Sequence, residues 1–275
     1  MSEPTIDAAF VEEFESGVHL AYQRMGSKLR NTLRTRDGVK NKTTFQKMGK
    51  GEATQKARHG VIAPMNLPHD NVTCTVEDWF AGEWVDELDT LRVNHDELMV
   101  AQESAAAALG RKTDSIIIDD ALTQTTSAHN ETTNGITLDW ALELMESFGI
   151  GEVPDDGQRM ATIGWQQWSQ LMKIKEFVNM DYVGEDQLPY KGGMTAKRWL
   201  SFMWVPFSGL KQGGAADRTE AYAYHKNAAA HAIGADVSSN MQYYNERDST
   251  FALNKMQMGA CLIDQEGVYK LDLKN

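Results

Sequence analysis

The chain has 275 residues, 41% of them hydrophobic, and it contains 9 Phe, 8 Tyr and 7 Trp. A chain of this length and composition can bury a substantial core, which excludes a protein that is disordered throughout. Its formal net charge of −12 opposes a surface that binds nucleic acid by general affinity.

Residues 7–23 are predicted to form a short amphipathic helix, because Phe10, Phe14 and Val18 recur at helical spacing. The start of the chain is acidic where a signal peptide would be basic and then apolar, and no apolar run approaches the roughly 20 residues of a membrane span. We therefore expect a chain that is made and kept in a cytoplasm.

Residues 27–70 are predicted to form a long polar β-hairpin with a turn at Asp37-Gly38. Its large apolar residues are few, so it has no core of its own and must rest on another surface. Residues 24–58 carry eleven Lys or Arg against two acids, a charge of +9 that leaves −21 on the rest of the chain. The hairpin cations proposed as an intersubunit contact are Lys28, Arg30, Arg34, Arg36, Lys40, Lys42, Lys47, Lys50, Lys56 and Arg58.

Two partners fit this basic hairpin. The favoured one is the acidic surface of another copy of the chain, because complementary charge steers and registers association. The alternative is nucleic acid, which the same composition permits. Phe45 is the single aromatic residue in the basic segment, which argues against binding single strands by base stacking.

The following elements alternate between strand and helix. Residues 72–76 alternate as a half-buried strand, and Asn94 is predicted to cap a long helix that ends near Leu122. The β-branched run Ile116–Ile118 weakens the last turns of this helix. Further helices are predicted over 138–148, 165–178 and 228–233, and the first of them is expected to end at Gly149. Further strands are predicted over 159–164, 199–207 and 222–225, and in the C-terminal tail, which turns at Gly267. The fold class is therefore α+β.

No motif predicts a catalytic, metal or cofactor site. Gly110-Arg111-Lys112-Thr113 resembles the end of a phosphate-binding loop, but Ala105 stands where the second glycine is required, so a helix is favoured there. The seven histidines are scattered, and neither cysteine has a partner at zinc-ligand spacing. Five tryptophans could line a pocket, but they are expected in the core: Trp140, Trp165, Trp168, Trp199 and Trp204. Cys74 and Cys261 could form one long-range disulfide, although reduced thiols are favoured.

The order of these elements, with the stretches SKLRNTLRTR, ALGRKTDSIIIDDAL and YHKNAAAHAIG, resembles the major capsid proteins of tailed bacteriophages. The resemblance implies the Hong Kong 97-like capsid fold, an α+β fold with a long spine helix. It implies an N-terminal arm (1–26), an extended loop (27–70), a peripheral domain with the spine helix (71–134), an axial domain (135–235) and a return to the peripheral domain (236–275).

The same resemblance implies a structural subunit without enzymatic activity or cofactor. Copies would assemble in the host bacterial cytoplasm into hexamers and pentamers of an icosahedral virion shell around double-stranded DNA, with separate scaffolding, portal and decoration proteins as further partners. Two alternatives remain open at this point: an encapsulin-like bacterial compartment shell, and an acidic α+β enzyme with an unrecognised site.

Overall fold

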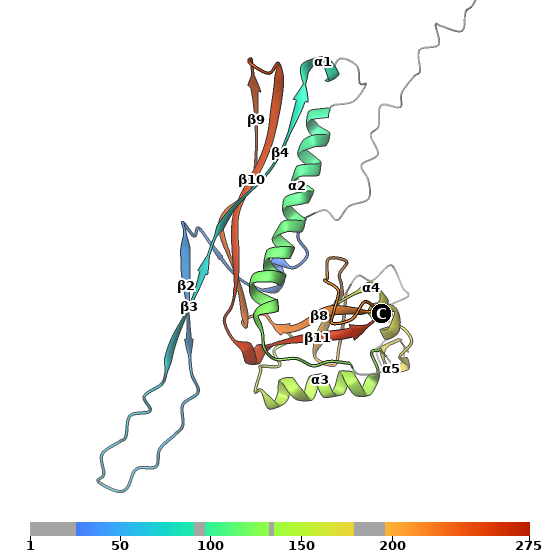
Figure 1. Cartoon of the computed structure of the whole chain (residues 1–275). Helices are drawn as coiled ribbons and strands as arrows, with labels where there is room; N and C mark the ends of the chain where they lie inside the picture. Colours follow the sequence, from blue (N-terminus) through green and yellow to red (C-terminus); the bar gives the residue numbers. More distant parts are fainter. Residues whose placement is uncertain (1–25, 91–96, 132–134, 179–195) are drawn as a thin grey trace, which may run out of the picture. The chain divides into compact units, whose positions relative to one another are not determined.

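The computed structural model describes residues 26–90, 97–131, 135–178 and 196–275 (Figure 1). The predicted helix over 7–23 and the predicted cap Asn94 lie outside these residues. The described chain divides into two compact units. The first contains Trp79–Gly110 and Val237–Met256, and the second contains Ser27–Asp78, Arg111–Asp236 and Gln257–Asn275.

A five-stranded sheet organises the C-terminal half of the second unit, with strand order β11-β8-β5-β7-β6. β5 and β7 are parallel and the other neighbours are antiparallel. The strands are β5 (Arg159–Ile163), β6 (Lys197–Trp199), β7 (Phe202–Pro206), β8 (Arg218–His225) and β11 (Val268–Lys274). β11 pairs with β8 along its whole length.

Helix α3 (Leu138–Ile150) belongs to the same unit and begins where Thr137 accepts a hydrogen bond from the backbone N–H of Trp140, at 3.3 Å. The helix runs past Gly149, the predicted end, and its C-cap is Gly151.

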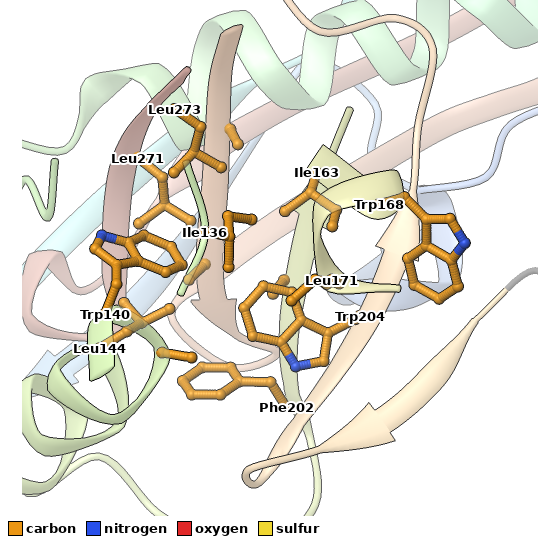
Figure 2. Close-up of a cluster of buried hydrophobic side chains, with 14 of the residues drawn as sticks. Ile136, Trp140, Leu144, Ile163, Trp168, Leu171, Phe202, Trp204, Leu271 and Leu273 are labelled. Carbon is orange, nitrogen blue, oxygen red and sulfur yellow. The ribbon is translucent and has the colours of Figure 1, made fainter. Parts of the chain in front are cut away.

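The core of this unit lies between the sheet and its helices, and Figure 2 shows its large side chains in contact. Leu171, Phe202 and Trp204 are fully buried. The rings of Phe148 and Phe202 meet edge to face with centroids 5.0 Å apart, a favourable aromatic geometry.

The predicted burial of the tryptophans is confirmed for Trp140, Trp168 and Trp204, and Trp199 packs at the edge of the same cluster. It is wrong for Trp165, which is 52% exposed. Trp165 is the first residue of a short helix, α4 (Trp165–Leu171), and Trp168, one turn later, occupies the buried face.

A second sheet has four strands in the order β1-β9-β10-β4. β1 pairs in parallel with the start of β9, Arg34 opposite Ala230. The strands are β1 (Arg34–Asp37), β4 (Glu77–Asp86), β9 (Ala229–Tyr244) and β10 (Ser249–Leu262). The chain passes from one unit to the other within β4, β9, β10 and helix α2 (Glu97–Ile116).

The first unit has a small core of its own. Leu98 and Ala101 of α2 pack with Val85 of β4 and Ala252 of β10. Beside this core, the ring of Trp84 lies 4.6 Å from that of Phe251, centroid to centroid. Helix α1 (Glu87–Thr90) follows β4.

Helix α2 ends as its sequence predicts. At the β-branched run it widens into a π-helical turn, η3 (Ile117–Ala121), and then tightens into a 3-10 turn, η4 (Leu122–Gln124). Ile117 and Ile118 are buried, so packing holds a segment that intrinsic helix propensity disfavours.

Three predicted elements are wrong in type or extent. The predicted helix 228–233 is instead the start of strand β9. The backbone of its buried alanines pairs with β1, and it does not form the hydrogen bonds of a helix. The predicted strand 199–207 is a hairpin of β6 and β7 that turns at Leu200-Ser201, both at positive φ. The predicted helix 165–178 is two short helices, α4 and α5 (Lys175–Val178).

The predicted long hairpin begins later than expected. β2 (Lys42–Met48) pairs antiparallel with β3 (His69–Thr75), and residues 49–68 join them without helix or strand. From here on the name extended loop refers to residues 49–68 alone. The Arg-rich stretch before the turn at Gly38 is β1, and it pairs with β9 in the four-stranded sheet instead of forming part of the hairpin. Gly38 has φ +74°, as a turn there requires.

Candidate functional site

The ten predicted contact cations lie in the second unit. Lys28 precedes η2 (Arg30–Thr32), and the other nine lie on η2, β1, β2, the extended loop and the residues between them. Arg30 and Lys47 are partly buried, and the other eight side chains are exposed. The structure therefore presents a cationic surface that continues from the base of the hairpin into the extended loop.

The segment that leads into this surface is anchored by Asp114 of α2. The carboxylate accepts hydrogen bonds from the Ser27 hydroxyl at 2.6 Å and from the backbone N–H of Leu29 at 3.0 Å. Leu29 and Leu33 are almost completely buried. The expectation that the segment has no core of its own is therefore wrong at its root.

The base of the hairpin also shares the subunit's core. β2 alternates, and its inward residues Thr43 and Phe45 are buried. Phe45 and Val39 pack in one cluster with Cys74 of β3 and Ala230 of β9. Most residues of both strands face solvent, and the few buried ones, such as Phe45 and Cys74, pack in a core that long-range contacts supply.

Three of the ten cations have ion-pair partners among the described residues. Arg30 forms a bidentate pair with Asp236, each N···O distance being 2.8 Å. Lys47 lies 2.8 Å from Asp264. Lys50 lies 3.0 Å from Glu152 and 3.3 Å from Glu266. These side chains fasten the hairpin to its own subunit.

The other seven cations form no ion pair with the described residues. Arg34 lies over the ring of Phe45, with its guanidinium carbon 5.5 Å from the centroid. Six cations make no ion pair with any residue that the structure describes: Lys28, Arg36, Lys40, Lys42, Lys56 and Arg58.

The extended loop carries an apolar patch that the sequence reasoning missed. Val61 is 96% exposed, Ile62 70% and Met65 51%. The signal was present in the stretch GVIAPM, an apolar run inside a loop without a core. Exposed apolar side chains gathered beside unpaired cations are typical of a surface that another macromolecule covers.

A polar hollow of about 220 Å³ lies at the foot of the loop, lined by Lys50, Glu152, Asp264, Glu266 and His225, among others. His225 is buried, with its Nε2 3.1 Å from the Asp156 carboxylate, and this hydrogen bond lowers the pKa of Asp156. Lys50 and its two acidic partners line the hollow, and none of the described residues around it is a nucleophile held by a base.

The remaining candidates for chemistry are structural. Gly110 and Thr113 lie inside α2, so the stretch that resembles a phosphate-binding loop is helical, as predicted. Over the described part of the chain, no three His, Cys, Asp or Glu side chains gather in a way that could hold a metal ion. No helix among the described residues is long and apolar enough to cross a membrane.

Comparison with known proteins gives a consistent result. The family model described as phage capsid protein matches residues 6–275. The capsid structure of cyanophage P-SCSP1u is similar with a TM-score of 0.77, at 14% identity over 98% of this chain and 94% of that one. Mycobacterium phage Che8 gives a TM-score of 0.73 at 15% identity, over 95% and 97%.

Mycobacterium phage Adephagia gives a TM-score of 0.69 at 15% identity over the whole of both chains. None of the curated proteins compared is significantly similar in sequence. At these identities the solved structures establish the fold, and the match to the family model extends over almost the entire sequence.

Proposed function

We propose that this chain, which belongs to the phage capsid protein family, assembles into hexamers and pentamers around double-stranded DNA. It is a structural subunit of a virion shell and has the tailed-phage capsid fold. The observation that carries this is the family match over residues 6–275. Neither an encapsulin-like compartment shell nor an enzyme is favoured by the comparisons.

The cationic surface and the apolar patch of the extended loop form the proposed contact with a neighbouring copy. Six cations without an ion-pair partner among the described residues and three exposed apolar side chains support an occupant that is both acidic and partly apolar. A second copy fits this description, because most of the chain outside residues 24–58 is strongly acidic.

Strand β4 offers the acidic counterpart on that neighbour. Glu77, Asp78, Glu83 and Asp86 are exposed on this one strand. In an assembled ring each subunit would supply its loop to one neighbour and its β4 to the other, so a single heterologous contact repeats until the ring closes.

The subunit itself carries out no catalysis in this proposal. Packaging of the genome falls to other proteins, and scaffolding, portal and decoration proteins are separate partners. Assembly takes place in the bacterial host, before the shell becomes part of the virion. DNA is held by enclosure and not by affinity, because a chain of net charge −12 opposes the phosphate backbone.

Negative-stain electron microscopy of the purified full-length protein, expressed with and without the other head proteins, tests the proposal. We expect hollow icosahedral particles or ring-shaped capsomers. Particles that enclose protein and exclude DNA when filled in the host would favour a compartment shell. A discrete monomer or dimer under all of these conditions would contradict assembly altogether.

A further inference from the structure

The two cysteines of the chain, far apart in the sequence, pack in the same buried cluster of the second unit. Cys74 lies near the end of β3 and Cys261 near the end of β10. Both are free thiols, 1% and 7% exposed, and both belong to the cluster at the base of the hairpin. No feature of shell assembly requires two thiols at this point.

The backbone brings β10 and the end of β3 into direct contact. A Cβ atom added to Gly259 would collide with the carbonyl oxygen of Thr75 and lie 3.2 Å from the Cα of Val76. Residues two apart in a strand face the same side, so Cys261 and Gly259 share one face of β10. Thr75 directly follows Cys74 in the chain, so both cysteines lie beside this contact and within the same buried cluster.

The two thiols also interact chemically. The pKa of Cys74 is lowered, mainly by a hydrogen bond with the Cys261 side chain and also by one with the backbone of Ala232. The pKa of Cys261 is raised by its hydrogen bond with Cys74 and by burial. The hydrogen bond therefore favours the thiolate on Cys74 and keeps the remaining proton on Cys261.

We propose that Cys74 and Cys261 are a redox-active pair that forms a reversible intrachain disulfide, with a small organic disulfide as the oxidant. The Cys74 thiolate attacks one sulfur of the oxidant, which forms a mixed disulfide and releases one thiolate. The Cys261 sulfur, after losing its proton to solvent, then attacks Cys74, which forms the protein disulfide and releases the second thiolate. The oxidant gains the two electrons that the cysteines lose.

The disulfide would connect the return strand of the hairpin covalently to the long strand β10. The loop would then be held at its base both by ion pairs of Lys47 and Lys50 and by a bond that salt does not weaken. Thiol reagents could release that bond without changing the sequence.

The test uses soluble full-length subunits and 2-hydroxyethyl disulfide under native conditions, followed by acid quenching, intact mass measurement and peptide mapping. We expect the wild-type protein to lose two hydrogen atoms in mass, with Cys74 and Cys261 joined in one cross-linked peptide pair, and dithiothreitol to reverse this. The Cys261→Ser variant should stop at a mixed disulfide on Cys74, because the resolving thiol is gone.

The wild-type measurement decides the proposal even where a serine variant fails to fold. Stable adducts on both thiols, or cross-linking between chains, would overturn it. So would native thiols that stay unreacted while the same protein in urea forms the adducts, because that would show two inert buried side chains.

Discussion

Asp114 accepts a hydrogen bond from the Ser27 hydroxyl at 2.6 Å, so a side chain of the long helix fixes the first residues of the segment that becomes the basic hairpin. The same carboxylate oxygen accepts the Leu29 N–H, and Asp114 is fully buried. Replacing it leaves buried donors without an acceptor, and hydrogen bonds to a charged group contribute about 1.5–3 kcal/mol each.

We therefore expect Asp114→Ala to lower the free energy of unfolding by about 2–4 kcal/mol. Chemical denaturation followed by circular dichroism measures the change. Glu143→Ala removes an exposed carboxylate from α3 and is the matched control, with an expected change within about 0.5 kcal/mol. Equal stability of the two variants would show that Asp114 does not anchor the segment.

Reversing free cations should block assembly and leave folding intact. The variant Lys42→Glu, Lys56→Glu and Arg58→Glu changes three exposed side chains without ion-pair partners among the described residues. An exposed pair contributes about 0.2–1 kcal/mol, and the contact recurs around each ring, so the protein concentration needed for assembly should rise more than tenfold. Light scattering measures assembly, and the melting temperature of the free subunit should not move.

A matched control places the same charge change on the body of the subunit, as Lys173→Glu, Lys175→Glu and Lys255→Glu. It should assemble at nearly the wild-type concentration. Arg30 is left unchanged in both variants because its partner Asp236 belongs to the same chain. If the loop variant and the body variant behave alike, overall charge governs assembly and the loop has no special part.

The apolar patch should contribute to the same contact by a different force. Val61→Ser with Ile62→Ser removes two exposed side chains whose burial would be worth about 1.5–3 kcal/mol each. Assembly should weaken equally at low and high salt, unlike the charge effect, which screening reduces. Ile150→Ser, at a 76% exposed position on α3, is the control. A loss of assembly that disappears at high salt would contradict an apolar contact.

His231 should make the folded subunit sensitive to acid. It lies on β9, it is fully buried, and neither ring nitrogen has a hydrogen-bond partner among the described residues. Burial, and then the charge of Arg30, lower its pKa from 6.5 to about 4. Because the folded state keeps the ring neutral while the unfolded chain takes up a proton, stability is complete above about pH 6.5 and falls as the pH drops toward 4.

The expected loss across this range is about 3 kcal/mol, from 1.36 kcal/mol for each unit of pKa difference. Unfolding curves measured between pH 7 and pH 4 give this slope. His231→Leu should reduce the loss of stability between pH 7 and pH 4. His69→Gln, at an exposed position on β3, should leave that loss unchanged. If the wild type and His231→Leu lose stability in parallel, other groups account for the acid sensitivity.

The sequence predicts features that depend on neighbours along the chain. The period of the apolar residues in α3 and the glycine spacing around Gly110 are local signals, and both led to correct elements. The run Ala228–Ile233 carries no alternation, so its pairing with β1 could not be read from it. The partners of Lys47 and Lys50 are distant in sequence, and no local pattern reveals them.

The parallel pairing of β1 with β9 has a consequence for the order of events during synthesis. Arg34 leaves the ribosome long before Ala230, its partner in the sheet, exists. Until then the N-terminal part of the fold has an open edge, and Leu29 and Leu33 lack most of the chain that later buries them. Contacts of such long range form slowly, and exposed edges invite pairing between chains. The pairing of β1 with β9 therefore forms only after residues 229–233 have left the ribosome, so the subunit completes its fold late in synthesis or after it.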